Sequence, residues 1–432
     1  MLLKDKLKDK SATICVIGLG YVGLPLICSF AKSGFNVVGL DIDESKISSL
    51  KSKKSYISYI NDSVIEELTE SSFTASSDYS HISDCDVIIF CVPTPLSKNR
   101  EPDLSFVLDT MMSIKPFLRE SQMISIESTT YPGMTDEIIA KEIDSKNFTI
   151  GKDYFLIYSP EREDPGNKDF STSNIPKIVG GHTEHCLNLG KILYESIVDQ
   201  VVSVSSTKAA EMTKLLENIQ RSVNIGLMNE MKVICTAMGL DIHEVIKAAE
   251  TKPFGFVSYY PGPGIGGHCI PIDPFYLTWK AKEFGLNTRF IELAGEINHS
   301  MPEWVLNQLT DELNNRSLPI KNSKVLILGI AYKKNVDDMR ESPASLIMKR
   351  LEEKGAHFDY SDPFIPSFPK IRNFDFGLKS IELSPQIISS YDAVILVTDH
   401  DEFDYEMIID NASLLIDTRG VYFDQAHNLI KA

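Results

Sequence analysis

Short apolar runs separated by amphipathic stretches characterise the first third of the chain. Thr13 to Gly18 and Asn36 to Leu40 are apolar almost throughout and are too short to be typical helices. Such runs are typical of strands that are buried in a parallel sheet. A helix that continues through Pro25 to Lys32 is expected between them. The pattern therefore predicts strand, helix and strand in succession, which is the repeating unit of an α/β fold.

Two further strands are predicted at 86–92 and 123–127, and each runs into a loop of turn-forming residues. The first loop is Pro93-Thr94-Pro95, and the second extends from Ser128 to Gly133. Loops at the carboxyl ends of parallel strands lie on the edge of the sheet where ligands bind. The hydroxyls of these loops are candidates to border a ligand, although the same residues are also common turn formers.

Near Ser205 the pattern changes to one long helical stretch, roughly 207–238. It carries Lys214 and Asn218 among apolar residues, and a spacing of four places both side chains on one helix face. We expect this helix to form a spine and a dimer surface. The two polar residues are candidates for chemistry, and the alternative is a solvated helix face.

A second unit with the same order of elements begins at the apolar run 324–331. A loop with basic residues follows over 332–342, and then a helix is expected from Pro343 to about Gly355. Its glycine fingerprint is degenerate, so the loop is expected to bind a different phosphate ligand. Further strands are expected up to Ser361, over 392–397 and over 414–417, with Arg419 after the last strand.

Composition narrows the class of protein. A chain of 432 residues is longer than one hydrophobic core usually supports, so two or three domains are expected. A net charge of −17 opposes nucleic acid as the main partner. The chain has no apolar run of about eighteen residues, and its first ten residues lack the apolar core of a signal peptide, so we expect a cytoplasmic protein that does not enter membranes. Seven scattered cysteines without a CxxC pair argue against a disulfide framework or a metal site.

The turn after the first strand carries a dinucleotide-binding fingerprint. Gly18, Gly20 and Gly23 form GxGxxG between strand and helix, where they allow a tight turn, close approach of a pyrophosphate and helix packing. Asp41 follows the second strand at the offset expected for an acid that binds a ribose hydroxyl, which favours NAD over NADP. Lys46 is a candidate for the same ribose, and the alternative is an exposed helix lysine. Tyr21 and Val22 complete the predicted NAD turn.

A second glycine-rich loop, 262–274, contains Cys269 and, four residues on, Asp273. Glycines let a backbone approach a substrate closely, and a nearby cation or dipole can lower the pKa of a thiol toward the reactive thiolate. The sequence makes Cys269 a candidate nucleophile. The alternative is an inert cysteine buried in a tight turn.

Seven motifs occur in order along essentially the whole chain, and together they resemble the UDP-glucose/UDP-mannose dehydrogenase family. STTYPG and SPEREDPGN are most similar to the UDP-N-acetylglucosamine 6-dehydrogenases of surface-polysaccharide pathways in bacteria and archaea. The motifs are GLGYVGLPL, VPTP, STTYPG, SPEREDPGN at 159–167, the Lys214 and Asn218 pair, GPGIGGHCIPIDP and the loop over 333–342.

The resemblance implies an α/β protein with two Rossmann-like doubly wound domains joined by a helical domain. The expected ranges are 1–204 for NAD, 205–315 for the helical dimerisation domain with the cysteine loop, and 316–432 for UDP. It also implies oxidation of a sugar C6 alcohol to a carboxylate in two hydride transfers. Cys269 would hold the intermediate as a thiohemiacetal and then as a thioester.

The resemblance also implies roles for single residues. Lys214 would stabilise an oxyanion, Asn218 would place the alcohol or its water, and Asp273 would position Lys214 or act through water. Glu161 would be the general base for thioester cleavage. Thr129 or Thr130 would contact that water or the nicotinamide, and the sequence does not decide between them.

Binding roles follow in the same way. Thr130, Thr94 and Arg340 are assigned to the NAD site. The residues assigned to the UDP-sugar are Arg162, Glu163, Lys214, Asn218, Tyr259, Tyr260, Gly266, Lys333 and Arg419.

The expected reaction is NAD-dependent oxidation of UDP-N-acetylglucosamine by a homodimer or higher oligomer. UDP-N-acetylgalactosamine or another UDP-hexose is the nearest alternative, because one hydrogen bond can decide between epimers. UDP-glucose and UDP-N-acetylmannosamine are disfavoured, because the enzymes for those sugars carry different residues after their Pro-Glu. A two-electron β-hydroxyacid dehydrogenase would share the first fold and a Lys-x-x-x-Asn pair but would have no use for Cys269. A non-catalytic protein that binds NAD and UDP-sugars is the third alternative.

Overall fold

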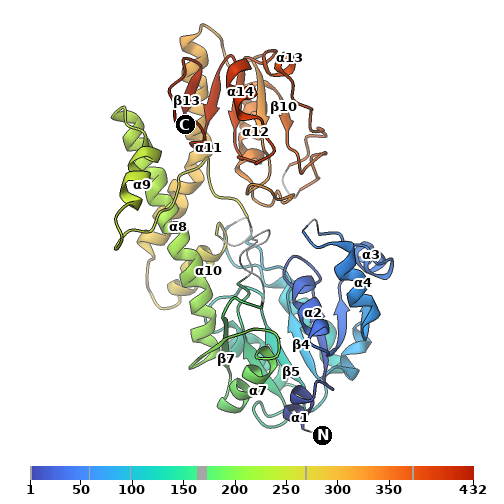
Figure 1. Cartoon of the computed structure of the whole chain (residues 1–432). Helices are drawn as coiled ribbons and strands as arrows, with labels where there is room; N and C mark the ends of the chain where they lie inside the picture. Colours follow the sequence, from blue (N-terminus) through green and yellow to red (C-terminus); the bar gives the residue numbers. More distant parts are fainter. Residues whose placement is uncertain (1, 58, 98, 163–172, 268–269, 372–373) are drawn as a thin grey trace. The chain divides into compact units, whose positions relative to one another are not determined.

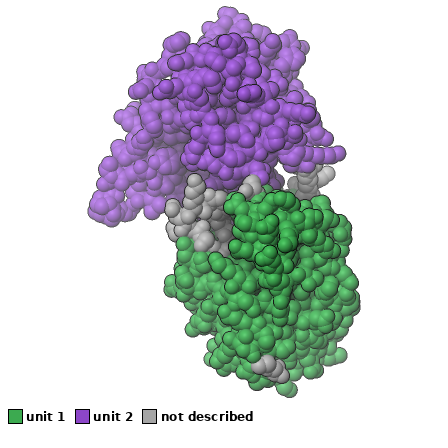
Figure 2. Space-filling view, turned by 45° about the vertical axis from the view of Figure 1, so that its right-hand side comes forward, with its two compact units in different colours: residues 1–217, 275–286 green, residues 218–274, 287–432 purple. Residues whose placement is uncertain are grey.

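The structure is a computed structural model of the chain, and it describes all residues except 1, 58, 98, 163–172, 268–269 and 372–373. It divides into two compact units (Figure 2), Met1–Glu217 with Phe275–Leu286 and Asn218–Pro274 with Asn287–Ala432. The domain boundaries expected near residues 204 and 315 stay predictions.

The first unit is built on an eight-stranded sheet (Figure 1) in the order β3-β2-β1-β4-β5-β6-β7-β8. All neighbouring strands are parallel except β6 and β7. The first six strands of that order follow the dinucleotide-binding Rossmann arrangement, whose crevice lies between β1 and β4. The strands are β1 Thr13–Ile17, β2 Asn36–Leu40, β3 Phe73–Ser76, β4 Val87–Phe90, β5 Met123–Ile126, β6 Phe155–Tyr158, β7 Lys177–Gly181 and β8 Val201–Val204.

Helices α1, α2 and α7 share one hydrophobic core with strands of this sheet. Leu3 and Leu7 of α1 are buried in it, so the charged opening of the chain packs as an amphipathic helix. The helices of the unit include α1 Leu3–Lys8, α2 Gly23–Lys32, α3 Glu44–Lys51, α4 Asp62–Glu70, α5 Ser105–Ile114, α6 Ala140–Asp144 and α7 Glu184–Tyr194, with the 3-10 helices η1 Tyr79–Asp84 and η2 Lys115–Phe117 and the π-helix η3 Thr135–Ile139.

The second unit contains a five-stranded parallel sheet in the order β10-β9-β11-β12-β13. In chain order this is 2-1-3-4-5, the other common doubly wound arrangement, whose crevice lies between β9 and β11. The predicted pair of Rossmann-like sheets is therefore confirmed. The elements are β9 Lys324–Leu328, α12 Pro343–Lys354, β10 His357–Ser361, α13 Pro385–Ile388, β11 Ala393–Leu396, α14 Tyr405–Asn411, β12 Leu415–Asp417 and β13 Leu429–Lys431.

Long helices connect the sheets along the chain. The predicted central helix is α8, Thr207–Ala237, which begins in the first unit and ends in the second. α9 is Ile242–Glu250, α10 is Asp273–Lys282 and α11 is Arg289–Asn315. The last turns of α11 bury Val305, Leu309 and other apolar residues in the core of the second unit.

No helix in the described part of the chain is both long enough and apolar enough to cross a bilayer.

Candidate active site

The glycine turn of the first unit leaves room where a pyrophosphate would bind. Gly18 has φ +92°, and a Cβ there would lie 2.4 Å from the carbonyl oxygen of Cys91, at the end of β4. A Cβ at Gly23 would lie 1.9 Å from the oxygen of Gly18. At Gly20, by contrast, a Cβ would have nothing within 4 Å. The first and third glycines are thus required by packing, and the second leaves open space for a ligand.

Asp41 lies directly after β2, as the fingerprint requires. One carboxylate oxygen accepts from the amide of Leu19 at 2.8 Å and from the ammonium of Lys46 at 2.9 Å. The other oxygen accepts from the amide of Asp43 at 2.9 Å. A carboxylate has about four acceptor sites, so three donors among the described residues leave capacity for a ribose hydroxyl. The turn and the acid fit NAD.

The loops after β4 and β5 lie on the same edge of this sheet. Ser128 ties them together, because its hydroxyl donates to the carbonyl of Val92 at 2.8 Å. Thr94 is buried and Thr129 is half-buried. Thr130 is fully buried, and its hydroxyl lies 3.2 Å from a carboxylate oxygen of Glu211. The two threonines that the sequence left undecided therefore differ: the hydroxyl of Thr130 is engaged inside the protein.

Glu211 on α8 has a buried side chain that binds the loop after β5. It accepts from the amide of Gly133 at 2.5 Å, and from the amide and hydroxyl of Thr135 at 2.9 and 2.7 Å. Burial raises the pKa of Glu211 to about 7, against the hydrogen bonds from Gly133, Thr135 and Thr130, which lower it. Glu211 thus fixes the backbone of the STTYPG motif.

Lys214, one turn further along α8, is paired with Glu161. Its ammonium donates to the backbone oxygen of Glu161 at 2.6 Å and lies 2.9 Å from the carboxylate. The two side chains are only 7% and 11% exposed. The cation predicted to stabilise an oxyanion and the predicted base are therefore direct neighbours. The sequence could not indicate this contact, because more than fifty residues separate the two.

Arg162 follows Glu161 and is held in a defined geometry. Its guanidinium contacts Glu217 on α8 at 2.5 and 3.3 Å and donates to the carbonyl of Pro176 at 2.6 Å. Glu163, the next residue assigned to the sugar, lies outside the described residues.

In the second unit, Asn218 and Asp273 meet. The amide of Asn218 donates to the carboxylate of Asp273 at 2.6 Å, and both side chains are buried. Asp273 therefore contacts the predicted asparagine. Tyr259 donates to Gln220 at 2.8 Å, and the exposed Tyr260 donates to Glu250 at 2.6 Å.

The glycine loop before the cysteine is packed too tightly for side chains. A Cβ at Gly266 would lie 2.7 Å from the Cβ of Tyr332. Gly267, with φ +85°, donates its amide to the carbonyl of Arg340 at 2.8 Å. This loop is therefore joined to the loop that follows β9. Cys269 itself lies outside the described residues.

The three basic residues assigned to nucleotides in the second unit have different surroundings. Lys333 is half-buried. Arg340 is exposed and paired with Asp338 at 2.7 Å. The guanidinium of Arg419 donates to the carbonyl of Val397 at 2.7 Å and would contact a Cβ at Gly262 at 3.0 Å. Lys333 and Arg419 follow β9 and β12, at the ligand edge of their sheet.

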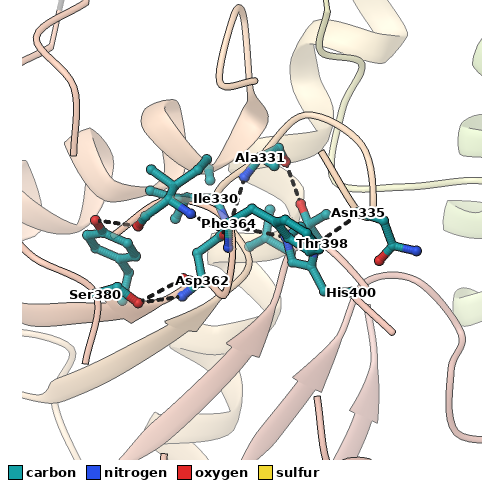
Figure 3. A network of polar contacts seen from close by, with 12 residues as sticks. Ile330, Ala331, Asn335, Asp362, Phe364, Ser380, Thr398 and His400 are labelled. Carbon is teal, nitrogen blue, oxygen red and sulfur yellow. Dashed lines mark hydrogen bonds and ion pairs between the residues drawn. The ribbon is translucent and has the colours of Figure 1, made fainter. Parts of the chain in front are cut away.

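Beneath that edge lies a network that the sequence did not reveal (Figure 3), centred on Asp362 after β10. Its carboxylate accepts from the amides of Ile330 and Ala331 at 2.7 and 3.1 Å, and lies 3.1 Å from Nε2 of His400. The side chains of Asp362 and His400 are both fully buried. An acid therefore follows the second strand of the sheet in both units. In the second unit this acid, Asp362, is fully buried.

Sequence reasoning missed Glu211 as well as Asp362 and His400. Glu211 carries a usable signal, because it stands three residues before Lys214 and so shares its helix face. The match between Asp362 and Asp41 was also visible, since both follow the second strand of their unit. Nothing in the sequence indicates His400, which meets Asp362 only through the parallel pairing of β10, β9 and β11.

The Rossmann sheet with its open glycine turn, together with a second parallel sheet that carries basic residues at its ligand edge, is the arrangement of an NAD-dependent nucleotide-sugar dehydrogenase. The chain belongs to the UDP-glucose/GDP-mannose dehydrogenase family. The NAD binding domain of that family matches residues 12–198, its central domain 208–300 and its UDP binding domain 326–424. The resemblance is confirmed, with GDP-mannose in place of UDP-mannose in the family's description.

Relatives at about one third identity include enzymes named for two different sugars. The chain is 34% identical over 396 residues to a UDP-N-acetyl-D-glucosamine 6-dehydrogenase of Pseudomonas aeruginosa, covering 91% of this chain and 92% of the relative. It is 35% identical over 443 residues to a UDP-N-acetyl-D-mannosamine dehydrogenase of Methanococcus vannielii, covering 98% and 96%. The solved UDP-D-ManNAc dehydrogenase of Pyrococcus horikoshii is 29% identical, with a TM-score of 0.86 and coverage of 97% and 98%.

Proposed function

We propose that this protein oxidises the C6 alcohol of UDP-N-acetylglucosamine to the carboxylate, with NAD as oxidant, and so supplies a uronic acid for surface polysaccharide. The observation that carries the proposal is the buried contact between Lys214 and Glu161, 2.9 Å apart. A cation and a carboxylate that are buried side by side suit a reaction that needs both an oxyanion partner and a base.

The cofactor is assigned to the first unit. Gly18, Gly20 and Gly23 would receive the pyrophosphate, and Asp41 would accept from a ribose hydroxyl with the acceptor capacity it retains. When bound, NAD supplies the chemistry of accepting a hydride, and two NAD molecules are needed for each alcohol oxidised to an acid. Thr129, whose side chain is half-buried, is assigned to the reacting region rather than Thr130.

The protein's own residues divide the remaining work. Lys214 would stabilise the negative charge on the sugar oxygen after its proton has passed to water, first in the alkoxide and then in the thiohemiacetal, before each hydride leaves. Asn218, held by Asp273 at 2.6 Å, would orient the alcohol with a preorganised amide. Glu161, which Lys214 holds by two contacts, would take a proton from the attacking water in the last step.

Cys269 is assigned as the nucleophile. Its thiolate would add to the aldehyde carbon to form a thiohemiacetal, and loss of the second hydride would leave a thioester. Water would then cleave the carbon–sulfur bond, which releases the carboxylic acid and restores the thiol. A covalent hold would keep the aldehyde from leaving between the two oxidations.

The UDP part of the substrate is assigned to the second unit. Lys333 and Arg419 would meet the nucleotide and the sugar phosphate, and Gly266 would contribute to the substrate site by letting its loop pack against Tyr332. Arg162, Tyr259 and Tyr260 are assigned to the sugar itself, as is Glu163. This division is supported by the match of the UDP binding domain to residues 326–424.

UDP-N-acetylmannosamine is the second candidate substrate. It is favoured by the Methanococcus vannielii relative, which is as similar to this chain as the Pseudomonas aeruginosa relative is. The two sugars differ in the orientation of the N-acetyl group at C2, and a single hydrogen bond can decide between them.

Limiting UDP-N-acetylglucosamine with excess NAD tests the proposal when the NADH formed per sugar is counted at completion. Two per sugar is expected. One per sugar would contradict the thioester scheme, and none, with two from UDP-N-acetylmannosamine, would assign the second substrate. Cys269→Ser should form no uronate. Cys28→Ser is the matched control, because burial raises the pKa of the Cys28 thiol to about 12 and keeps it protonated.

A homodimer is proposed as the working form. In the second unit, α8, α9, α11 and the chain between them expose large apolar side chains, which a second copy would cover. Light scattering should give twice the mass of one chain. A monomer that turns over at full rate would refute the dimer and leave the reaction untouched. The exposed residues are Leu227, Val233, Ile234, Met238, Leu240, Val245, Phe254, Val257, Phe290 and Leu293.

A further inference from the structure

We propose that His400 is a positioning residue that sets the nucleotide-binding loop, residues 331–341, through the backbone of Asn335. This inference rests on the proposed function, in which Lys333 of that loop meets the UDP part of the substrate. His400 is buried beneath the loop and does not itself reach the ligand edge.

The hydrogen bonds of His400 show which ring nitrogen carries the proton. Nδ1 lies 3.0 Å from the backbone amide of Asn335, and an amide N–H can only donate. Nδ1 must therefore be the unprotonated acceptor. The ring proton then sits on Nε2, which donates to the carboxylate of Asp362 at 3.1 Å (Figure 3). These two contacts together select one tautomer of the ring.

The imidazole has little freedom to move. The rings of Phe364 and Phe403 lie against it, with centroids at 5.0 and 5.6 Å. Asp362 is fixed in turn by four backbone amides, those of Ile330, Ala331, Phe364 and Ile365. The chain of contacts from Asp362 through His400 to Asn335 is therefore built on the ends of two strands, β10 and β11, and it ends in the loop.

The loop is held on both sides of Lys333. On one side, Ala331 donates its amide to Asp362, and its carbonyl accepts from the hydroxyl of Thr398 at 2.6 Å. On the other side, Asn335 donates its amide to His400 and has φ +60°, which asparagine adopts more readily than most residues other than glycine. Without the imidazole acceptor, the far end of this segment would lose its buried anchor.

Two substitutions separate the two contacts of the imidazole. His400→Gln can place an amide near Nε2 and keep the donor to Asp362, but it offers Asn335 no acceptor. His400→Asn can place an oxygen near Nδ1 and keep the acceptor, but it loses the donor to Asp362. His357→Gln, at the exposed start of β10, is the matched control.

The experiment measures UDP binding to the full chain by calorimetry, with NAD binding as the check on folding, and KM and kcat for the UDP-sugar. His400→Gln should weaken UDP about tenfold or more and raise KM similarly, while kcat and NAD affinity change less than about twofold. His400→Asn should stay within about threefold of the wild type, and His357→Gln should match it. Amide hydrogen exchange over 331–341 should be faster in His400→Gln alone.

Three results would overturn the positioning role. They are UDP affinity in His400→Gln equal to that of His357→Gln, weaker binding in His400→Asn than in His400→Gln, or a parallel loss of NAD and UDP affinity in both variants. A wild type that makes NADH without binding UDP would also overturn it. A wild type that binds UDP but oxidises no UDP-N-acetylhexosamine would instead refute the proposed reaction, and the variants would still decide the role of His400 in UDP binding.

Discussion

The turn after the first strand has the same local geometry in both sheets but serves a different purpose in each. In each unit a glycine with positive φ follows the first strand, and its missing Cβ makes room for a carbonyl across the crevice, that of Cys91 for Gly18 and that of Thr398 for Gly329. In each unit the acid after the second strand accepts from the residue after that glycine, at 2.8 Å in the first and 2.7 Å in the second.

The difference lies in what the acid and the next residue do. Asp41 has three donors among the described residues, whereas Asp362 has five. Gly20 faces open space, whereas its counterpart Ala331 is bonded to Asp362 and Thr398. The same local geometry thus leaves a ligand site open in one unit and becomes a support for a longer loop in the other.

Removing the two acids should give the largest difference between the units. Asp362→Ala leaves four buried amides and a buried imidazole without their acceptor, so we expect a loss of about 3–5 kcal/mol in the free energy of unfolding. Asp41→Ala removes fewer contacts and should cost about 1–2 kcal/mol. Denaturant unfolding of both variants measures this. An equal cost would contradict the supporting role of Asp362, and Asp362→Asn gives an intermediate step if the alanine variant does not fold.

Glu211 extends the comparison to a carboxyl that titrates. Burial raises its pKa from 4.5 to about 7, so between these values the folded state binds more protons than the unfolded state. Stability should therefore fall as pH rises through that range, by about 1–3 kcal/mol, and level off above it. Glu211→Gln should flatten this slope in thermal unfolding between pH 4.5 and 8. The exposed Glu195→Gln is the control and should keep the slope.

The affinity for NAD should depend on Asp41 and not on Asp362. Asp41→Asn should weaken NAD about tenfold and narrow its advantage over NADP, because the charge that repels a 2′-phosphate is gone. Asp362→Asn should leave the NAD dissociation constant unchanged. Fluorescence titration with NADH and NADPH measures both, and a matching loss in Asp362→Asn would break the distinction between the two acids.

The smallest effects are expected at the second position of each turn. Gly20→Ala should barely alter the melting temperature, since its Cβ meets nothing within 4 Å, yet it should weaken NAD several-fold by filling the space. Ala331→Gly should cost less than about 1 kcal/mol through backbone entropy and leave UDP binding in place. Strong destabilisation by Gly20→Ala would show that the turn has no free space beside Gly20.

Local patterns predicted the elements well where chemistry and periodicity agree. The first strand, the glycine turn, the helix to Lys32 and Asp41 all lie where the sequence indicated. Five strands of three to five residues were not predicted, because runs this short carry little periodicity: β3, β6, β7 and β8 in the first unit and β13 in the second. The contact of Lys214 with Glu161 and that of His400 with Asp362 were out of reach, because each joins distant segments through the sheet order. The roles of Cys269 and Glu163 stay predictions, since both residues lie outside the described chain.

Where each helix starts has a consequence for how the two sites can diverge. In the first unit α2 starts at Gly23, pressed against the nucleotide turn, so a change in that turn disturbs the helix. In the second unit α12 starts only at Pro343, with its own cap from Ser342 to the amide of Ala344. The intervening loop can lengthen, shorten or change charge while the sheet and helix stay as they are. Among descendants of this fold, preference for the sugar nucleotide should therefore drift readily, while preference for the dinucleotide stays fixed.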